Sequence, residues 1–243
     1  EIGLFDLIKQ GYLSRIVIKS LPLEIDLSKV QQTSGDYDAT QLGDALTPYL
    51  GAIARQIRQH APYPRRTLAF LPLIKTSLDF VAACREAGLV AAHVDGMSED
   101  REEILKRFAR GEFDVLSNAM LLTEGYDDPG IDCIVNLRPT RSRSLYSQIV
   151  GRGTRICEGK ENLLLLDFLW AHQRMNLIRP AHLVSTGDEQ AEVITKLAEA
   201  GGEGEQDLEA LATDAAEQRH ESLRKKLEAN SKKKGETIDA EAW

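Results

Sequence analysis

The chain has 243 residues, of which 42% are hydrophobic and 28% charged, and its formal net charge is −8 at pH 7. No apolar run approaches the roughly 20 residues that a membrane helix needs, so the composition excludes a membrane-spanning or fibrous protein. An evenly spread negative charge would also argue against nucleic-acid binding. The charge is uneven, however: residues 188–217 hold ten acidic residues and one lysine, whereas residues 138–179 hold eight basic and three acidic residues. The negative net charge therefore comes from the acidic segment and does not reflect the basic segment at 138–179.

The three cysteines, Cys84, Cys133 and Cys157, lack the paired spacing that predicts a disulfide framework. We therefore expect a reducing, cytoplasmic setting. The histidines show no H-x-x-x-H spacing and the cysteines no C-x-x-C spacing, so no metal site is predicted. Because the chain opens on Glu1 without an initiator methionine, we expect it to be a piece of a longer protein.

The first elements predicted along the chain are two strands and a helix. Apolar runs at 16–18 and 23–25 predict the strands, and an amphipathic pattern predicts a helix at 45–59 that ends before Pro62 and Pro64. From residue 67 to residue 168, short apolar runs alternate with segments whose apolar residues recur at helical spacing. The predicted strands are 68–71, 90–94, 113–116, 131–135 and 163–166, and the predicted helices are 76–87, 98–110 and 143–152.

This alternation predicts an α/β fold, with an open, doubly wound and mainly parallel sheet between two layers of helices. Strands without polar alternation fit a sheet that is covered on both faces. After residue 168 the alternation stops, and the pattern predicts two helices at 188–200 and 206–229. The chain is thus expected to end in a charged helical tail.

The segment 146–155, Tyr-Ser-Gln-Ile-Val-Gly-Arg-Gly-Thr-Arg, carries the most specific pattern. Arg152 and Arg155 lie three residues apart, on one face if the segment is helical, beside a glycine that lets a ligand or another backbone come close. Two converging guanidinium groups suit a polyphosphate, because arginine stays protonated and binds anions through paired hydrogen bonds. A solvated basic helix end is the alternative interpretation.

A second polar segment, 122–129, follows the strand that ends at Ser117 and Asn118. Loops after strand ends are where ligands bind in open sheets. Thr123 offers a hydroxyl to a phosphate, and Asp127 offers a carboxylate to a sugar hydroxyl or to an arginine. An ordinary turn with an Asp-Pro signature is the alternative.

Together these segments resemble motifs V and VI of the superfamily 2 DEAD/DEAH-like helicases and translocases. The family's Gln-x-x-Gly-Arg-x-x-Arg and Glu-Gly-x-Asp-x-Pro are matched by Gln148, Gly151, Arg152 and Arg155 and by Glu124, Gly125, Asp127 and Pro129. Residues 68–74 resemble motif IV, and His-Val-Asp-Gly at 93–96 resembles the segment that follows it. The resemblance covers residues 67–168.

The resemblance implies a C-terminal, second RecA-like motor domain that meets a first motor domain across a shared ATP. It makes Arg155 the arginine finger and Arg152 its companion, and it places Gln148 near the attacking water or the phosphates. The residues implied to border the nucleotide are Gly125, Asp127 and Gly151. ATP and Mg²⁺ are the implied cofactors, with Mg²⁺ held by the first domain.

The other half of such an ATP site is missing from the sequence. Before Lys160, Thr154 stands where the first glycine of a phosphate loop would be, and neither Asp-Glu-x-His nor Asp-Glu-Ala-Asp occurs. By the resemblance, residues 1–66 are a lead-in from the first motor domain and the start of the second, 67–185 the RecA-like domain and 186–243 the tail. We therefore expect the chain alone to hydrolyse no ATP.

The family binds a single strand through its backbone phosphates. The candidates that the resemblance implies here are Thr123, Ser117, Asn118, Lys75 and Thr76, with ordinary helix capping as the alternative for the last two. Phosphate contacts read no bases, so binding should be largely independent of sequence and weaken steeply with salt. The Glu-Gly-x-Asp-x-Pro variant favours DNA, single-stranded or duplex, and leaves RNA open.

Two functions from different classes follow from this reading. The first is the second motor domain of an ATP-dependent helicase or translocase. The second is a non-catalytic RecA-like binding or regulatory module that acts through its acidic tail on a protein partner. The arginine pair favours the first function, since a scaffold needs neither arginine.

Overall fold

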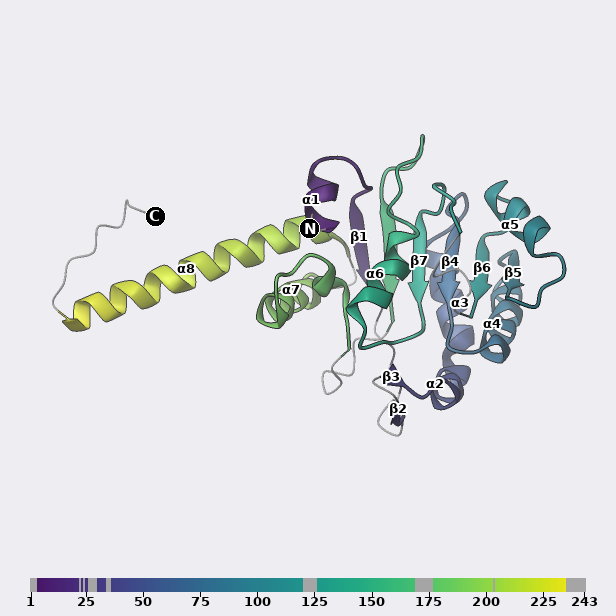
Figure 1. Ribbon diagram of the computed structural model, residues 1–243, viewed down its shortest axis with the longest axis horizontal. Coiled ribbons are helices and arrows are strands. Elements are labelled where there is room, and N and C mark those ends of the chain that lie inside the picture. The colour runs from purple at the N-terminus through teal and green to yellow at the C-terminus, as the bar shows by residue number, and fades with distance from the viewer. Residues whose placement is uncertain are drawn as a thin grey trace.

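The computed structural model describes residues 4–21, 23, 25, 30–33, 36–119, 126–168, 177–202 and 204–234. At its centre is a seven-stranded sheet in the order β5-β6-β4-β7-β8-β1-β9 (Figure 1). Six strands are parallel, and β9 at one edge is antiparallel to β1. The strands are β1 (Ile16–Ser20), β4 (Thr67–Phe70), β5 (Ala91–Val94), β6 (Val115–Asn118), β7 (Cys133–Asn136), β8 (Leu163–Asp167) and β9 (Glu205–Asp207), beside a hairpin of β2 (Gln32–Thr33) and β3 (Asp36–Tyr37).

Helices cover both faces of the sheet (Figure 1). On one face pack α2 (Ala39–Leu46), α3 (Leu50–His60) and α4 (Ile74–Glu86), with the short 3₁₀ helix η1 (Thr47–Tyr49) between the first two. On the other face pack α1 (Leu4–Lys9), α5 (Arg101–Ala109), α6 (Arg143–Gly151), η3 (Pro180–Leu183), α7 (Asp188–Ala200) and the start of α8 (Leu208–Lys234).

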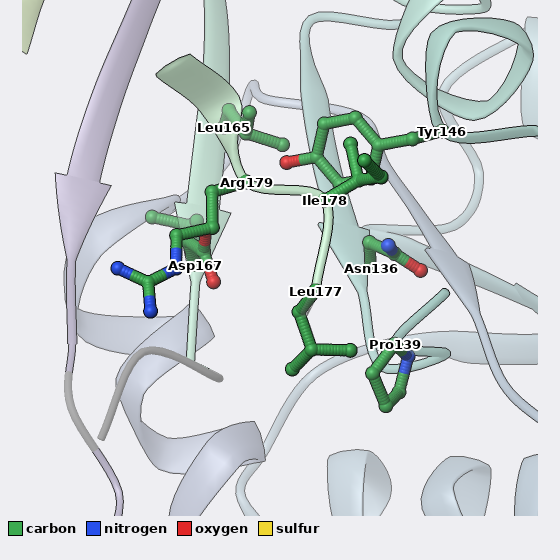
Figure 2. A pocket seen from close by; sticks show the side chains of 9 residues that line it. Asn136, Pro139, Tyr146, Leu165, Asp167, Leu177, Ile178 and Arg179 are labelled. Carbon is green, nitrogen blue, oxygen red and sulfur yellow. The ribbon is translucent and has the colours of Figure 1, made fainter. Parts of the chain in front are cut away.

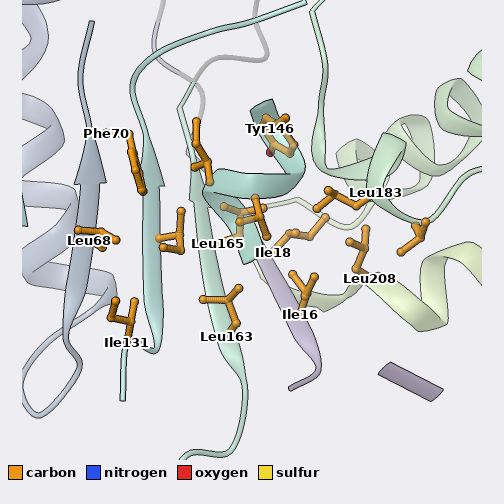
Figure 3. Close-up of a cluster of buried hydrophobic side chains, with 14 of the residues drawn as sticks. Ile16, Ile18, Leu68, Phe70, Ile131, Tyr146, Leu163, Leu165, Leu183 and Leu208 are labelled. Atoms are coloured by element: carbon orange, nitrogen blue, oxygen red, sulfur yellow. The ribbon is translucent and has the colours of Figure 1, made fainter. Parts of the chain in front are cut away.

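Strand β8 shows how a run of leucines serves both layers. Leu163 and Leu165 belong to one hydrophobic core, and Leu164 and Leu166 belong to the other. Successive side chains of a strand point to opposite faces, so a strand covered on both faces needs no polar alternation. Figure 3 shows the first core, in which Leu163 and Leu165 lie with residues of α6 and α8.

The predicted α/β fold, with helices on both faces of a mainly parallel sheet, is confirmed. The five strands predicted between residues 67 and 168 form as β4, β5, β6, β7 and β8, with small shifts at their ends. The three helices predicted in the same stretch form as α4, α5 and α6.

Of the run at 23–25, the structure describes Leu23 and Ile25, and neither belongs to the predicted strand. The backbone N–H of Ile25 donates to the carbonyl of Leu23 at 2.8 Å. Ile25 is nevertheless fully buried in the core. Its apolar character therefore reflects burial and not strand pairing.

The single helix predicted at 45–59 is two helices. Helix α2 begins earlier than predicted because the Asp38 side chain caps it by accepting a hydrogen bond from the Gln41 N–H at 2.9 Å. Pro48 lies in the first turn of η1, where its missing N–H is tolerated, and α3 follows directly.

The tail helix begins at Leu208 because the three residues before it form β9. Asp207 lies opposite Val17 of β1 and forms an ion pair with Arg15. The same carboxylate accepts hydrogen bonds from the N–H groups of Glu209 and Ala210, which caps α8. The sheet thus draws strands from all three predicted segments, and the division of the chain at residues 66 and 185 stays a prediction.

Only the first turns of α8 pack on the sheet. Leu208, Leu211, Ala212 and Ala215 are buried there, and the rest of the helix extends away from the sheet (Figure 1). Within the described residues, no helix combines the length and apolar character that crossing a bilayer requires.

Two leucines of α8 should therefore differ sharply in their effect on stability. Leu208 is 1% exposed and Leu223 is 49% exposed. We predict that Leu208→Ala lowers the free energy of unfolding by about 3 kcal/mol, because it leaves a cavity under the helix. Leu223→Ala should change it by less than about 0.5 kcal/mol. Urea unfolding of the two variants checks this, and equal losses would contradict the packing described.

Candidate functional site

Helix α6 carries the chain from one edge of the sheet to the other. It begins just after β7, where the Ser142 hydroxyl oxygen caps it by accepting from the Leu145 N–H at 3.2 Å. After α6, the N–H of Ser14, which precedes β1, donates to the carbonyl of Thr154 at 2.6 Å. The segment 152–155, which we call the arginine turn, therefore lies where the parallel strands begin. We call this side of the sheet, at the amino ends of the strands, the arginine edge; the opposite edge is the side at their carboxyl ends.

Asp127 lies at this same edge, because it precedes β7 and contacts the segment 152–155. Arg155 Nη1 lies 2.6 Å from Asp127 Oδ2, and the two side chains are 48% and 55% exposed. Arg152 Nη1 donates to the carbonyl of Tyr126 at 2.7 Å. The rule that ligands bind where strands end misplaces Asp127, but the pairing of Asp127 with an arginine, one of its two predicted contacts, is observed.

A glycine lets the arginine turn sit tightly on the sheet. An added Cβ at Gly153 would overlap the Leu163 side chain of β8 and crowd Ile134 of β7. A Cβ at Gly151 would meet no atom within 4 Å. The close approach expected of a glycine in this segment is thus made by Gly153, and the predicted nucleotide contact of Gly151 stays a prediction.

Asp128, next to Asp127, belongs to a buried anchor. Its two carboxylate oxygens accept hydrogen bonds from Nη1 and Nη2 of Arg66 at 3.0 and 3.1 Å. The Arg66 guanidinium also donates to the carbonyls of Gly130 and Ala109, and the Tyr126 hydroxyl donates to Asp128 Oδ2 at 3.1 Å. Burial and the Asp128 charge raise the pKa of Tyr126, so the phenol stays a donor.

The Lys160 side chain connects the arginine turn to the residues that follow Asp127 and Asp128 along the chain. Its Nζ donates to the carbonyls of Ile131 at 2.7 Å, Gly153 at 2.6 Å and Arg155 at 2.8 Å. Burial lowers the pKa of Lys160 to about 8, although the nearby Asp132 carboxylate opposes this shift. The carbonyl oxygens favour the charged ammonium as well.

Of the candidates for nucleic-acid binding, Ser117, Asn118, Lys75 and Thr76 lie at the opposite edge, where β4 and β6 end. Ser117 is fully buried and its Oγ lies 2.6 Å from Ser77 Oγ, while the Asn118 amide donates to the carbonyl of Ala69 at 2.9 Å. Thr76 is also buried. Lys75 is different, since its side chain is 79% exposed and pairs with Asp79 at 3.0 Å. The surface position required for a phosphate contact is thus found at Lys75, and the three buried side chains point inward in this arrangement.

The other predicted residues are distributed as follows. Gln148 is exposed on α6, three residues before Gly151. Thr123 and Gly125 lie outside the described residues. Among the residues that the structure describes, no group of three or more His, Cys, Asp or Glu side chains could hold a metal ion.

A small cavity lies where β7 and β8 end (Figure 2). It is lined by Asn136, Tyr146, Asp167, Leu177 and Arg179, among others, and its volume is about 20 Å³. This volume holds a water molecule and not a nucleotide. Neither Arg152 nor Arg155 lines this cavity, and the Arg155 side chain is half-exposed at the edge where the strands begin.

The sequence of residues 50–157 matches the family described as "Helicase conserved C-terminal domain". Residues 50–157, somewhat less than half of the chain, thus form a helicase C-terminal domain. A solved structure described as "the fragment structure of a putative HsdR subunit of a type I restriction enzyme from Vibrio vulnificus YJ016" shares the fold over 69% of this chain and 34% of that chain, with a TM-score of 0.54 and 23% identity.

Two curated relatives are similar in sequence over a longer part of the chain. They are "Putative ATP-dependent helicase IRC3" of Saccharomyces cerevisiae, 29% identical over 175 residues, and "Putative mitochondrial ATP-dependent helicase irc3" of Schizosaccharomyces pombe, 32% identical over 175 residues. The matches cover 70% and 71% of this chain but 25% and 29% of those proteins. The chain thus spans little more than a quarter of the length of these relatives.

The sequence patterns did not reveal the roles of Arg66, Asp128 and Lys160. Arg66 and Asp128 are 62 positions apart and look like ordinary surface residues in the sequence. Lys160 follows a glycine, but that Gly-Lys pair signals only an incomplete phosphate loop. Gly130 offered the best signal, since a glycine directly after a proline often marks a turn with a close backbone approach.

Substitution of two glycines tests the Arg66–Asp128 anchor. A Cβ at Gly130 would overlap the Arg66 guanidinium, so Gly130→Ala should break the buried ion pair and cost about 3 kcal/mol of unfolding free energy. The matched control is Gly51→Ala in α3, where a Cβ has room and a helical alanine should stabilise by about 0.5–1 kcal/mol. Urea unfolding measures both, and a neutral Gly130→Ala would show that the anchor contributes little.

Proposed function

We propose that this chain is the second motor domain of an ATP-dependent nucleic-acid helicase or translocase. In this role it supplies Arg155 and Arg152 to an ATP molecule that a first motor domain holds. The observation that carries the proposal is the exposed Arg155–Asp127 ion pair beside Arg152 at an open edge of the sheet. Both curated relatives are described as "putative" ATP-dependent helicases, which supports the proposal.

The geometry suits an arginine that changes partner. A half-exposed ion pair contributes about 1 kcal/mol or less, so Arg155 can leave Asp127 for a phosphate at little cost. Arg152 is more firmly placed, because the Tyr126 carbonyl accepts from its Nη1. Two guanidinium groups held in this way stabilise charge on a phosphoryl group during transfer.

The remaining nucleotide contacts fit the same edge. Asp127, once released by Arg155, offers its carboxylate to a sugar hydroxyl. Gln148 and Gly151 lie on the helix that leads into the arginine turn, and Gly125 belongs to the preceding motif. ATP would bring Mg²⁺, which neutralises phosphate charge and which we assign to the first motor domain.

Nucleic acid is proposed to bind at the opposite edge of the sheet. Lys75 is exposed at the start of α4, where helix N–H groups favour an anion. Thr123 belongs to the same proposal, whereas Ser117, Asn118 and Thr76 would serve by shaping this edge from within. DNA is the favoured ligand because of the Glu-Gly-x-Asp-x-Pro motif. The free cysteines 84, 133 and 157 fit the cytoplasmic, reducing setting that we propose.

Removal of the arginine finger tests the catalytic proposal. In a protein with both motor domains, Arg155→Ala should lower nucleic-acid-stimulated ATP turnover by about 10³-fold. The control is Arg224→Ala, an exposed arginine of α8 that pairs with Glu228 and should leave turnover unchanged. The 243-residue chain alone should show no turnover. Full activity of Arg155→Ala would exclude the arginine finger and favour the non-catalytic module.

A pair of lysines tests the nucleic-acid proposal. Lys75→Ala should reduce the slope of log K against log salt concentration by about one unit, because one phosphate contact is lost. The control is Lys106→Ala in the last turn of α5, where the lysine is also exposed and paired at i,i+4 spacing. Fluorescence anisotropy of a labelled single strand at several salt concentrations measures both slopes. Equal slopes for the two variants would remove Lys75 from the interface.

A further inference from the structure

Lys160 belongs to none of the motifs described above, yet it contacts the segments of both. Gly159 before it has a φ of +80°, a left-handed conformation that favours glycine, and the Lys160 N–H donates to the Cys157 carbonyl at 3.1 Å. This turn directs the lysine side chain toward the carbonyls of Ile131 and Gly153. The ammonium group then lies between the arginine turn and the start of β7.

The contacts of the ammonium match its donor count. Three N–H bonds meet the carbonyls of Ile131, Gly153 and Arg155 at 2.6–2.8 Å, and the Pro129 carbonyl lies at 3.4 Å. Pro129 and Ile131 follow Asp127 and Asp128 along the chain, while Gly153 and Arg155 belong to the arginine turn. One cation therefore binds the backbones of both motif segments.

We propose that Lys160 is a positioning residue that sets where the Arg155 side chain leaves the backbone relative to Asp127. This inference rests on the proposed function of Arg155. An arginine finger acts only if its guanidinium reaches the phosphate with the correct geometry, and a misplacement of about 1 Å can cost a factor of about 10² in rate. Lys160 fixes the carbonyl of that same residue.

The fold does not depend on Lys160 alone. Ser14 holds the arginine turn independently, because its N–H donates to the Thr154 carbonyl at 2.6 Å and its hydroxyl donates to the Arg155 carbonyl at 3.0 Å. Loss of the ammonium should thus loosen the turn without detaching it. An effect of Lys160 on turnover can then be separated from an effect on folding.

Steady-state kinetics of Lys160→Met, Arg155→Ala and the double variant test the inference in a protein with both motor domains. Lys160→Met should lower kcat by about 10- to 100-fold, while the KM for ATP changes by less than about threefold. The double variant should turn over no more slowly than Arg155→Ala, because both substitutions remove the same contribution of Arg155 to catalysis. Lys196→Met, an exposed lysine of α7, is the control and should match the parent.

Hydrogen exchange supplies an independent measurement on the 243-residue chain. Lys160→Met should speed amide exchange at residues 153–155 by about tenfold or more, with global exchange little changed. Unchanged exchange there would overturn the proposal even if Arg155→Ala proved fully active and the arginine finger failed. If Arg155→Ala is impaired, two further results would also overturn the proposal. One is that the losses of the two single variants multiply in the double variant. The other is that the turnover of Lys160→Met falls only in proportion to the fraction of that variant that is folded.

Discussion

The bidentate ion pair of Arg66 and Asp128 is the constraint on which the arginine edge depends. Arg66 directly precedes β4 and also donates to carbonyls at the end of α5, so one guanidinium joins a central strand, a covering helix and the segment before β7. Both side chains are largely buried, and loss of one partner would leave an uncompensated charge. Asp127 stands next to this fixed point, so the anchor sets where the ion-pair partner of Arg155 lies.

The topology separates two kinds of chemistry along the strands. Helix α6 returns the chain to the edge where the strands begin, and this edge holds the arginine pair. Lys75 and the buried polar group of Ser77 and Ser117 lie at the edge where strands end. Strand β6 runs parallel to β4 and β5, from the edge where the strands begin to the edge that holds Ser117.

Sequence patterns predicted the sheet and the arginine pair because both are local. Apolar runs reveal β4 to β8, and Arg152 and Arg155 are three positions apart. The Arg66–Asp128 pair joins distant positions, so no local pattern announces it. Strand β9, Glu-Gln-Asp, has no apolar residue and is a strand only because β1 offers an unpaired edge. Ser117 and Asn118 look like surface residues, and only the fold supplies the internal partners that permit their burial.

The outer part of α8 projects from the sheet, so a rotation of the sheet would move the far end of the helix over a larger distance than its start. Beyond Ala215, the last of its buried residues, about 19 residues extend from the sheet, which corresponds to about 29 Å of rigid rod at about 1.5 Å per residue. Ion pairs of Glu221 with Lys225 and of Arg224 with Glu228 stiffen it along its length. A rotation of the sheet by about 10° would sweep the far end of this rod through about 5 Å. A small rotation of the sheet would thus displace the far end of the rod by about the distance between two neighbouring strands.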